Sequence, residues 1–176
     1  MPPAFETRRL LLQPRLPADT EACLAMDREP EMVRFIAEIG QLLGDPAAHR
    51  AFVEARTRGP YPSGLGYWTL RRREAPSDFL GWVLLIPING QGPEVEIGWR
   101  LRRAAWGQGY ASEAAAAMLR HGLGGLGLPK VVADIDPANL GSIRVAEKIG
   151  LRPRGATPDW PGAVRYALSR EEWDDL

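Results

Sequence analysis

Hydrophobic and polar positions alternate along the first third of the chain in a way that predicts one strand followed by two helices. The run at 7–14 is apolar at its centre and ends at a proline, which predicts a strand. A helical spacing of apolar residues follows over 18–26. Asp45 before Pro46 is a typical helix start, an N-cap with proline at the first helical position, and predicts a helix that continues to about Arg58.

The middle of the chain contains three strand-like runs with turn residues between them. These runs cover 67–72, 78–87 and 94–101, and they are rich in aromatic and branched side chains. Because the connections are short, we expect the three strands to form an antiparallel meander.

A helix and then alternating strands and helices are predicted for the remainder. The alanine-rich segment from Tyr110 favours a helix, which we expect to end near Leu123 because each of the glycines that follow costs about 1 kcal/mol in a helix. The pattern then predicts a strand at 129–135, a helix at 139–149 stopped by a glycine, and a strand at 164–168. Ser169 and Glu172 have the spacing of a capping box, which predicts a last short helical turn.

Length and composition indicate one soluble domain over residues 1–176. Hydrophobic residues make up 45% of the chain and charged residues 25%, which is typical of a globular protein. The 22 basic and 22 acidic residues cancel, so no overall field favours nucleic acid or an anionic membrane as a partner. The opening lacks the long apolar stretch of a signal peptide and no segment reaches the length of a membrane span, so we expect a cytoplasmic protein.

The single cysteine excludes two classes of structure. Cys23 has no partner for a disulfide within the chain, and one thiolate is too few for a metal cluster. Cys23 is therefore interpreted as a small apolar helix residue.

The segment EVEIGWRLRRAAWGQGYASEA places two glycines between a predicted strand and a predicted helix. The first turn of a helix has backbone N–H groups without partners and the positive end of the helix dipole, so an anion is favoured there. Gly107 and Gly109 have no side chains and allow a phosphate to approach the backbone. The segment therefore predicts a phosphate site.

Two other phosphate-binding motifs fit less well. A P-loop needs glycine, lysine and serine or threonine in succession, and Gly109 is followed by Tyr110 and Ala111. A dinucleotide fingerprint needs a third glycine where the chain has Ser112, and it belongs early in a parallel unit rather than after a meander.

The motif WGQGYASEA after a strand, with NLGSIRVAEKIGL thirty residues later, resembles the GNAT (Gcn5-related N-acetyltransferase) family, in particular its RimJ/RimL-like branch. ETRRLLLQP resembles the usual start of that branch and EIGWRL its fourth strand. The resemblance implies an α/β (α+β) fold with a mixed, mostly antiparallel central sheet of six to seven strands. It also implies helices on both faces and a fourth and a fifth strand that splay apart.

The resemblance further implies how acetyl-CoA, the co-substrate, is bound. Backbone groups of the fourth strand are expected to contact the pantetheine arm, and amides of the glycine loop to contact the diphosphate: Trp99, Arg100 and Leu101 for the arm, and Gly107, Gln108, Gly109, Tyr110, Ala111 and Ser112 for the diphosphate. One departure is Ala104, where the family usually has Gln or Arg. Arg102 or Arg103 would supply the missing charge, or both are solvated surface residues.

Glu96 is the candidate general base. On a strand, Glu94, Glu96, Gly98 and Arg100 share one face, so both acids point the same way. Burial in a substrate cleft would raise the pKa of Glu96 and make it a better acceptor for the proton of an amine. The alternative is a half-exposed strand with ordinary surface acids, which fits Glu94 better because Glu94 lies at the turn.

Asn139 and Ser142 form the second candidate group, at the start of a predicted helix. Taken alone, Asn139 is a routine N-cap and Ser142 an early-turn residue. In the family, a tyrosine seven residues after the asparagine often protonates the thiolate, but this chain has Ala146 there, and Gly150-Leu151 replaces the usual Gly-Phe. The resemblance implies that Ser142 donates a hydrogen bond to the leaving thiolate and that Asn139 holds pantetheine or a water.

Other polar residues do not suggest a competing chemistry. Asp134 and Asp136 flank a strand end without a His or Glu at ligand spacing, so we expect no metal. His49 and His121 lie far apart on predicted helices without a nucleophile elbow, which argues against a hydrolytic triad.

The resemblance implies an N-acetyltransferase that transfers an acetyl group from acetyl-CoA to a primary amine by direct attack in a ternary complex. The amine would be a protein N-terminus or a small molecule, selected by residues 27–45 and by the loop 155–163 with Trp160. A non-catalytic acyl-CoA-binding module is the alternative, because Ala146 and Ala104 replace frequent family residues. An exposed edge strand would also allow a homodimer.

Overall fold

One mixed sheet forms the centre of the computed structural model, which describes residues 2–90, 92–158 and 160–175. The sheet is antiparallel throughout except for one parallel pair. Its eight strands are β1 (Phe5–Glu6), β2 (Leu10–Pro14), β3 (Gly66–Arg72), β4 (Ala75–Pro87), β5 (Val95–Leu101), β6 (Lys130–Ile135), β7 (Arg152–Ala156) and β8 (Val164–Ser169). They lie in the order β1-β2-β3-β4-β5-β6-β8-β7. The meander predicted in the middle of the chain is thus confirmed as β3, β4 and β5.

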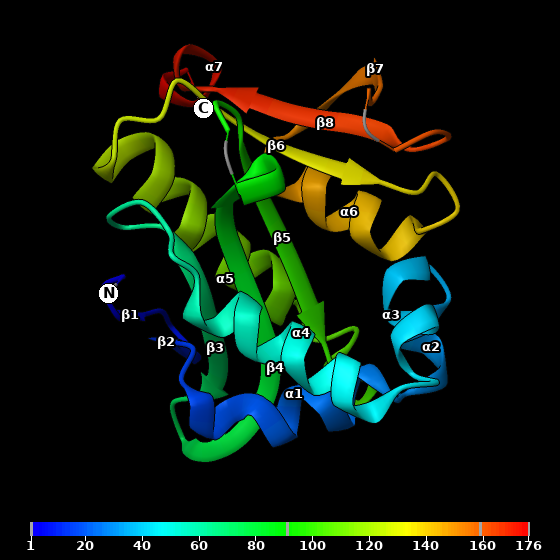
Figure 1. Cartoon of the computed structure of the whole chain (residues 1–176). Coiled ribbons are helices and arrows are strands. Elements are labelled where there is room, and N and C mark those ends of the chain that lie inside the picture. The colour runs from blue at the N-terminus through cyan, green and yellow to red at the C-terminus, as the bar shows by residue number, and fades with distance from the viewer. Residues whose placement is uncertain (1, 91, 159, 176) are drawn as a thin grey trace.

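Helices cover both faces of the sheet (Figure 1). One face carries α1 (Thr20–Asp27), α2 (Pro30–Val33), α3 (Ala37–Leu42) and α4 (Pro46–Arg58), and the other carries α5 (Tyr110–Leu119), α6 (Leu140–Lys148) and α7 (Arg170–Asp174). A large apolar core lies beneath α5 and α6, and a smaller one lies beneath α1 and α4. The expected arrangement of layers is confirmed.

Side chains of β5 alternate between the larger core and the opposite face of the sheet, as its sequence predicts. Val95, Ile97 and Leu101 are buried in the larger core. Glu96 and Gly98 therefore face the side of α1 to α4, because successive side chains of a strand point to opposite faces.

The strands β5 and β6 run parallel and separate after a short contact. Their pairing consists of two residue pairs, Val95 with Val131 and Glu96 with Val132. Beyond Glu96 the two strands diverge, and in Figure 1 β6 and β8 cross the direction of β5. Because β5 contains EIGWRL, the predicted fourth strand, the separation of β5 and β6 is the predicted splay of the fourth and fifth strands.

Several elements differ from the prediction. The expected six to seven strands are eight, because β1 and β7 add short edge strands. Neither α2 nor α3 was predicted, since helices of four and six residues carry little periodic signal. The strand predicted at 7–14 is β2, and it begins at Leu10 rather than at Thr7.

The helix expected to end near Leu123 is α-helical only to Leu119 and continues as a π-helix from Arg120 to Gly125. Its glycines allow close packing, which is why helical structure persists there. A Cβ on Gly122 would lie 3.1 Å from Cδ2 of Leu85, and one on Gly124 would lie 2.9 Å from the Trp173 ring. Tertiary packing thus outweighs the low helix propensity of glycine.

The start of α4 is fixed by its predicted cap. The Asp45 carboxylate accepts hydrogen bonds from the N–H groups of Ala47 and Ala48, at 3.1 and 3.0 Å. Asp45→Ala is expected to lower the free energy of unfolding by about 1 kcal/mol in urea titrations, because two N–H groups lose their acceptor. Glu74→Ala at an exposed turn is the control, and equal losses in the two variants would contradict the capping role.

Candidate functional site

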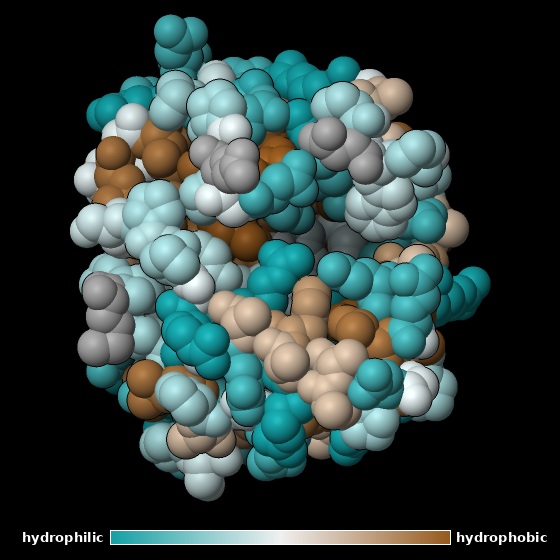
Figure 2. Space-filling view, viewed as in Figure 1, coloured by the Kyte–Doolittle hydropathy of each residue, from teal (hydrophilic) through white to brown (hydrophobic). Residues whose placement is uncertain are grey.

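A cavity of about 590 Å³ opens on the face that carries α1 to α4. Figure 2 shows a hollow near the centre of this side of the molecule, with hydrophilic side chains along much of its border. The walls come from α1, α3 and α4, from the strands β3 to β6, and from the start of α6. The cavity therefore brings together Glu96, Trp99, Arg100, Asn139 and Ser142 from the predicted set.

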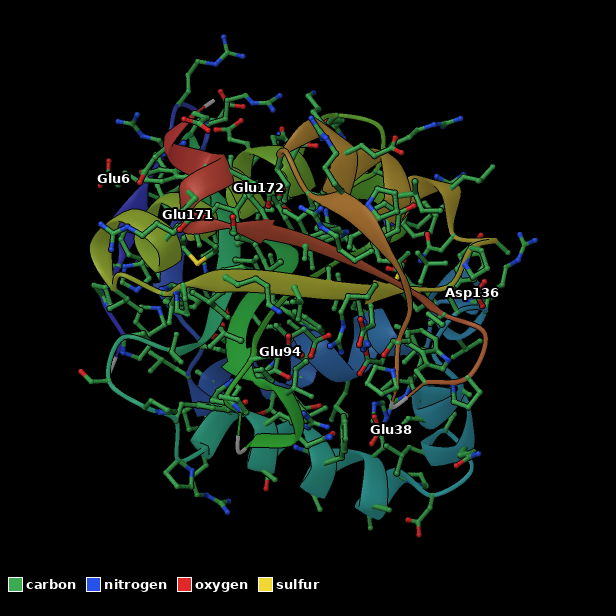
Figure 3. The ribbon with its side chains drawn as sticks, turned by 90° about the horizontal axis from the view of Figure 1, so that it is seen from above. Glu6, Glu38, Glu94, Asp136, Glu171 and Glu172 are labelled. Atoms are coloured by element: carbon green, nitrogen blue, oxygen red, sulfur yellow. The ribbon has the colours of Figure 1, made fainter. Side chains whose placement is uncertain are left out.

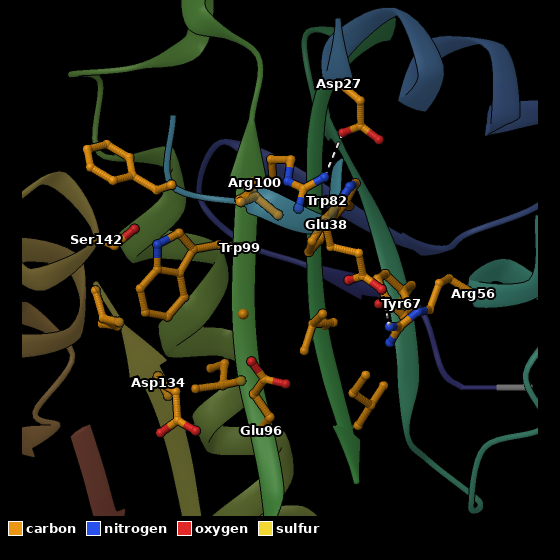
Figure 4. A pocket seen from close by; sticks show the side chains of 18 of the residues that line it. Asp27, Glu38, Arg56, Tyr67, Trp82, Glu96, Trp99, Arg100, Asp134 and Ser142 are labelled. Carbon is orange, nitrogen blue, oxygen red and sulfur yellow. Dashed lines mark hydrogen bonds and ion pairs between the residues drawn. The ribbon is translucent and has the colours of Figure 1, made fainter. Parts of the chain in front are cut away.

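The Glu96 carboxylate faces this cavity without a hydrogen bond or ion pair to any other described residue (Figure 4). Burial, aided by the negative charge of Asp134, raises the pKa of Glu96 to about 7, while Arg56 and Arg165 act in the opposite direction. A carboxylate with this pKa is half-protonated near neutral pH, which suits a general base.

Glu94, its neighbour on the same strand face, has a different environment. Its carboxylate lies 2.5 Å from Lys130 Nζ and 2.5 Å from Arg165 Nη1. The hydrogen bond from Lys130 lowers the pKa of Glu94 despite partial burial, and the Arg165 charge lowers it further. Glu94 is therefore engaged in two ion pairs, which agrees with its interpretation as an ordinary surface acid rather than a base.

The acids at the end of β6 are also engaged. Asp134 accepts hydrogen bonds from Arg165 and from Thr157 Oγ1, and Asp136 accepts one from the Ala138 N–H at 2.8 Å. Figure 3 shows Asp136 on the same side of the molecule as Glu38, away from Glu6 and Glu171. Within the ranges that the structure describes, no three His, Cys, Asp or Glu side chains group as metal ligands.

Asn139 and Ser142 lie at the first turn of α6. The Asn139 side-chain oxygen accepts the Ser142 N–H at 3.1 Å, so Asn139 is a helix cap. The Ser142 hydroxyl forms no hydrogen bond with another described residue, and Ser142 and Trp99 both line the cavity (Figure 4). This hydroxyl is free to donate to a bound molecule.

The glycine loop presents unpaired donors at the N-terminus of α5. Gly107 and Gly109 have positive φ values of 73° and 78°, and Gly109 is the N-cap of the helix without any side-chain cap. The first intrahelical bond is that of Glu113 to the Gly109 carbonyl, so the N–H groups of the preceding turn have no partner within the helix. These donors and the helix dipole fit a diphosphate.

Arg9 holds this loop in place, and sequence reasoning missed it. Its guanidinium donates to the Gln108 carbonyl at 2.8 Å and to Glu113 Oε2 at 2.7 Å, and it lies over the Tyr110 ring. Burial opposes ionisation of Glu113, but the hydrogen bonds from Thr7 and Arg9 lower its pKa. The loop is thus anchored to the segment that immediately precedes β2.

Beyond Glu96, the main-chain groups of β5 on the β6 side have no strand partner. The Arg102 N–H donates to the Leu80 carbonyl on β4, and hydrogen-bonded pairs alternate along an antiparallel ladder. The peptide groups of Arg100 therefore face β4, whereas those of Trp99 and Leu101 face the opening toward β6. The Leu101 carbonyl there accepts the Trp106 indole N–H at 2.6 Å.

The Arg100 side chain takes part in a buried network that the sequence did not predict. Its Nη1 donates to Asp27 Oδ1 at 2.6 Å, and the other oxygen of Asp27 lies 3.0 Å from His49 Nε2. His121 lies elsewhere, 2.8 Å from the Gly64 carbonyl oxygen. The two histidines are not brought together.

The charges near Ala104 do not reach the glycine loop. Arg102 binds Asp78 at 3.0 Å, and Arg103 lies over the Trp106 ring with 60% of its side chain exposed. Gln108 donates to the Ala104 carbonyl at 3.0 Å. Arg9 is thus the arginine that contacts the glycine loop directly, through the Gln108 carbonyl.

Both segments expected to select the acceptor contribute to the cavity wall. Phe35 and Glu38 come from the region 27–45, and Trp160 comes from the loop 155–163. Asp159 of that loop lies outside the described residues.

No helix in the described part of the chain has the length and apolar character needed to cross a membrane.

Comparison with known proteins agrees with this geometry. The model of the acetyltransferase (GNAT) domain matches residues 9–152. An Aspergillus fumigatus protein named FsC-acetyl coenzyme A-N(2)-transacetylase is 30% identical over an alignment 192 positions long. The alignment covers 97% of this chain and 78% of the fungal one.

Solved structures show the same fold. An acetyltransferase of the GNAT family from Bacillus anthracis is 25% identical, with a TM-score of 0.76 over 97% of this chain and 100% of its own. The ribosomal L7/L12 alpha-N-protein acetyltransferase RimL, solved with coenzyme A, is 16% identical, with a TM-score of 0.75 over 97% of this chain and 99% of its own, a likeness of fold alone. The chain belongs to the GNAT acetyltransferase family.

Proposed function

We propose that this protein is an N-acetyltransferase that transfers an acetyl group from acetyl-CoA to a primary amine by direct attack in a ternary complex. The observation that carries the proposal is the position of Glu96: a half-buried carboxylate, unpaired within the described ranges, in the same cavity as the free Ser142 hydroxyl, beside the splay of β5 and β6. In this arrangement one cavity contains a proton acceptor for the amine, Glu96, and a hydrogen-bond donor for the thiolate, Ser142.

The cofactor side of the proposal rests on main-chain donors. N–H groups at residues 107–112 bind the diphosphate, and Trp99 and Leu101 offer peptide groups to the amides of the pantetheine arm. The arm then passes through the opening between β5 and β6, which directs its sulfur toward Ser142. Asn139 keeps Ser142 in position by capping α6.

The chemical step needs a neutral amine and a stabilised leaving group. Glu96 accepts a proton from the ammonium group, directly or through water, and the amine nitrogen then attacks the thioester carbonyl carbon. As the C–S bond breaks, the Ser142 hydroxyl donates a hydrogen bond to the thiolate sulfur. The nitrogen loses its second proton after the attack, and the thiolate takes up one proton to give coenzyme A. Glu96 releases the other proton to solvent, which restores the base, and the N-acetylated amine is the second product.

A nitrogen acceptor is supported by the fungal relative, whose name describes an acetyl coenzyme A N(2)-transacetylase. We further propose membership of the RimJ/RimL-like branch, supported by a serine at position 142 where other members rely on a later tyrosine. Residues 1–176 are proposed to form one acetyltransferase domain, because the fungal match covers 97% of the chain.

Thiol release from acetyl-CoA in the presence of a pooled amine library tests the function. The proposal expects amine-dependent release of coenzyme A and acetylated amines in the mass spectrum. Tight binding of acetyl-CoA with no acetylated product from any amine would instead identify a non-catalytic acyl-CoA-binding module.

Ser142→Ala is expected to lower kcat about tenfold, with little change in the dissociation constant of acetyl-CoA, because a hydrogen bond to a charged group is lost only as the thiolate forms. Steady-state thiol-release assays give kcat, and calorimetry gives the dissociation constant of acetyl-CoA. Ser142→Thr keeps the hydroxyl and should retain most of the activity. If both variants lose activity equally, the hydroxyl has no such role.

A further inference from the structure

Arg15 is a buried cation at the wall of the cavity, without a carboxylate partner among the described residues. The residue is 7% exposed, and it forms no ion pair with any acid in the described ranges. Its Nε donates to Thr57 Oγ1 at 2.9 Å and its guanidinium lies 3.9 Å from the centre of the Tyr67 ring, but its Nη2 is buried without a hydrogen-bond partner. A buried charged donor without an acceptor is costly, so the site is short of an anion.

Arg100 adds a second incompletely satisfied guanidinium on the same wall. Its Nε is buried without a partner, and its guanidinium lies 4.8 Å from the centre of the Trp82 ring. Its one carboxylate partner in the described part of the chain, Asp27, is shared with His49. Donors therefore outnumber acceptors here too.

Arg56 of α4 completes a group of three arginines, which we call the arginine cluster: Arg15, Arg56 and Arg100. Arg56 faces the cavity with its side chain 41% exposed, and its ion pair with Glu38 is long, at 3.9 Å (Figure 4). The Tyr67 phenol lies among these charges: burial raises its pKa, and the charges of all three arginines oppose that rise.

The Glu96 carboxylate, which lines the same cavity, has the reverse imbalance. The Glu96 carboxylate has no partner there among the described residues, and it is close enough to act on the pKa of Tyr67 together with the arginine cluster. A single cavity thus contains guanidinium groups that lack an anion and a carboxylate that can accept a proton from an amine.

We propose that the acceptor is a small amino carboxylate, with its amine at Glu96 and its carboxylate at the arginine cluster. This inference rests on the proposed acetyltransferase function. Glu96 and Arg100 are four positions apart on β5, so their Cα atoms lie about 13 Å apart, and acceptors with several bonds between nitrogen and carboxylate fit better than glycine. The Trp82 and Tyr67 rings provide the apolar surface for the intervening atoms.

Matched probes test this assignment. We would measure binding of 6-aminohexanoate and of 6-aminohexanamide to the CoA-saturated protein by calorimetry, and acetylation of both by mass spectrometry. The carboxylate should bind about tenfold more tightly than the amide, because it gains charge-assisted hydrogen bonds. The series from glycine upward measures the best chain length.

Two substitutions locate the effect. Arg56→Met should remove most of the preference for the carboxylate, and its partly exposed position makes it well tolerated. Arg58→Met is the matched control, because Arg58 is exposed on the same helix and does not line this cavity. Arg15→Met is the second variant, although its burial makes a folding check by circular dichroism necessary.

The outcomes separate the inference from the function beneath it. Equal affinities for carboxylate and amide, no measurable affinity for any carboxylate of the series, or a preference that Arg56→Met leaves intact would overturn the inference. A carboxylate preference that Arg56→Met abolishes supports the inference. If that preference is found but no bound amine is ever acetylated, the proposed function fails while the assignment of the arginine cluster stands.

Discussion

Replacing Glu96 by glutamine is expected to lower kcat/KM for acetyl transfer by about 10²- to 10⁴-fold, with the affinity for CoA unchanged. Glutamine has nearly the same shape but accepts no proton, and Glu96 lies away from the glycine loop, so binding of the diphosphate should persist. Steady-state thiol release and calorimetry with CoA measure the two quantities. A loss smaller than threefold would exclude Glu96 as the base.

The pH dependence gives a second test of the same residue. Because burial raises the pKa of Glu96 to about 7, kcat/KM of the native protein should rise as the pH increases through 7, when the carboxylate loses its proton. Glu96→Gln should lack this inflection. Glu94→Gln should keep it, because Glu94 is engaged by Lys130 and Arg165 outside the cavity.

As the pH rises, the contribution of Glu96 to the free energy of unfolding should fall, whereas kcat/KM should rise. The folded protein keeps the Glu96 proton up to about pH 7, whereas the unfolded chain releases it near its ordinary value of 4.5. The folded state therefore binds more protons across this window, and this group's contribution to stability falls as the pH rises through it. In urea titrations, Glu96→Gln should be more stable relative to the native protein at pH 8 than at pH 5.

Gly109→Val is expected to weaken CoA binding by about a hundredfold or more, the equivalent of losing one or two hydrogen bonds to a charged group. Gly109 has a φ of 78°, which a β-branched residue rarely adopts, so the N–H groups of the loop would reorient. A Cβ would also lie 3.4 Å from Arg9 Nη2, beside the anchor of the loop. Calorimetry with CoA measures the loss.

A matched glycine separates this effect from general strain. Gly90 has a φ of 73°, a Cβ there would have no described atom within 4 Å, and the residue lies outside the cavity. Gly90→Val should lose stability, because of its strained backbone, while binding CoA normally. Equal losses of CoA affinity in the two variants would contradict the assignment of the loop.

Features with a local signal could be predicted from the sequence. Asp45, Asn139 and Ser169 cap helices as their residue types and spacing indicated. The alternation along β5 placed Glu96 on the correct face before its surroundings were known. In each case neighbours within a few residues determine the outcome.

Features that depend on distant partners could not be predicted. The strand β7 contains a proline and a glycine and is exposed throughout, so it forms only because β8 lies beside it. Arg9 acts through Glu113, 104 residues away, and Arg100 through Asp27, 73 residues away. The raised pKa of Glu96 likewise requires the burial that the assembled cavity provides.

A crystal structure of the protein with coenzyme A tests the central claim most directly. We predict that the diphosphate lies against the N–H groups of residues 107–112 and that the thiol lies in the opening between β5 and β6, within hydrogen-bonding distance of the Ser142 hydroxyl. Coenzyme A bound elsewhere, or a diphosphate without contacts to this loop, would contradict the account.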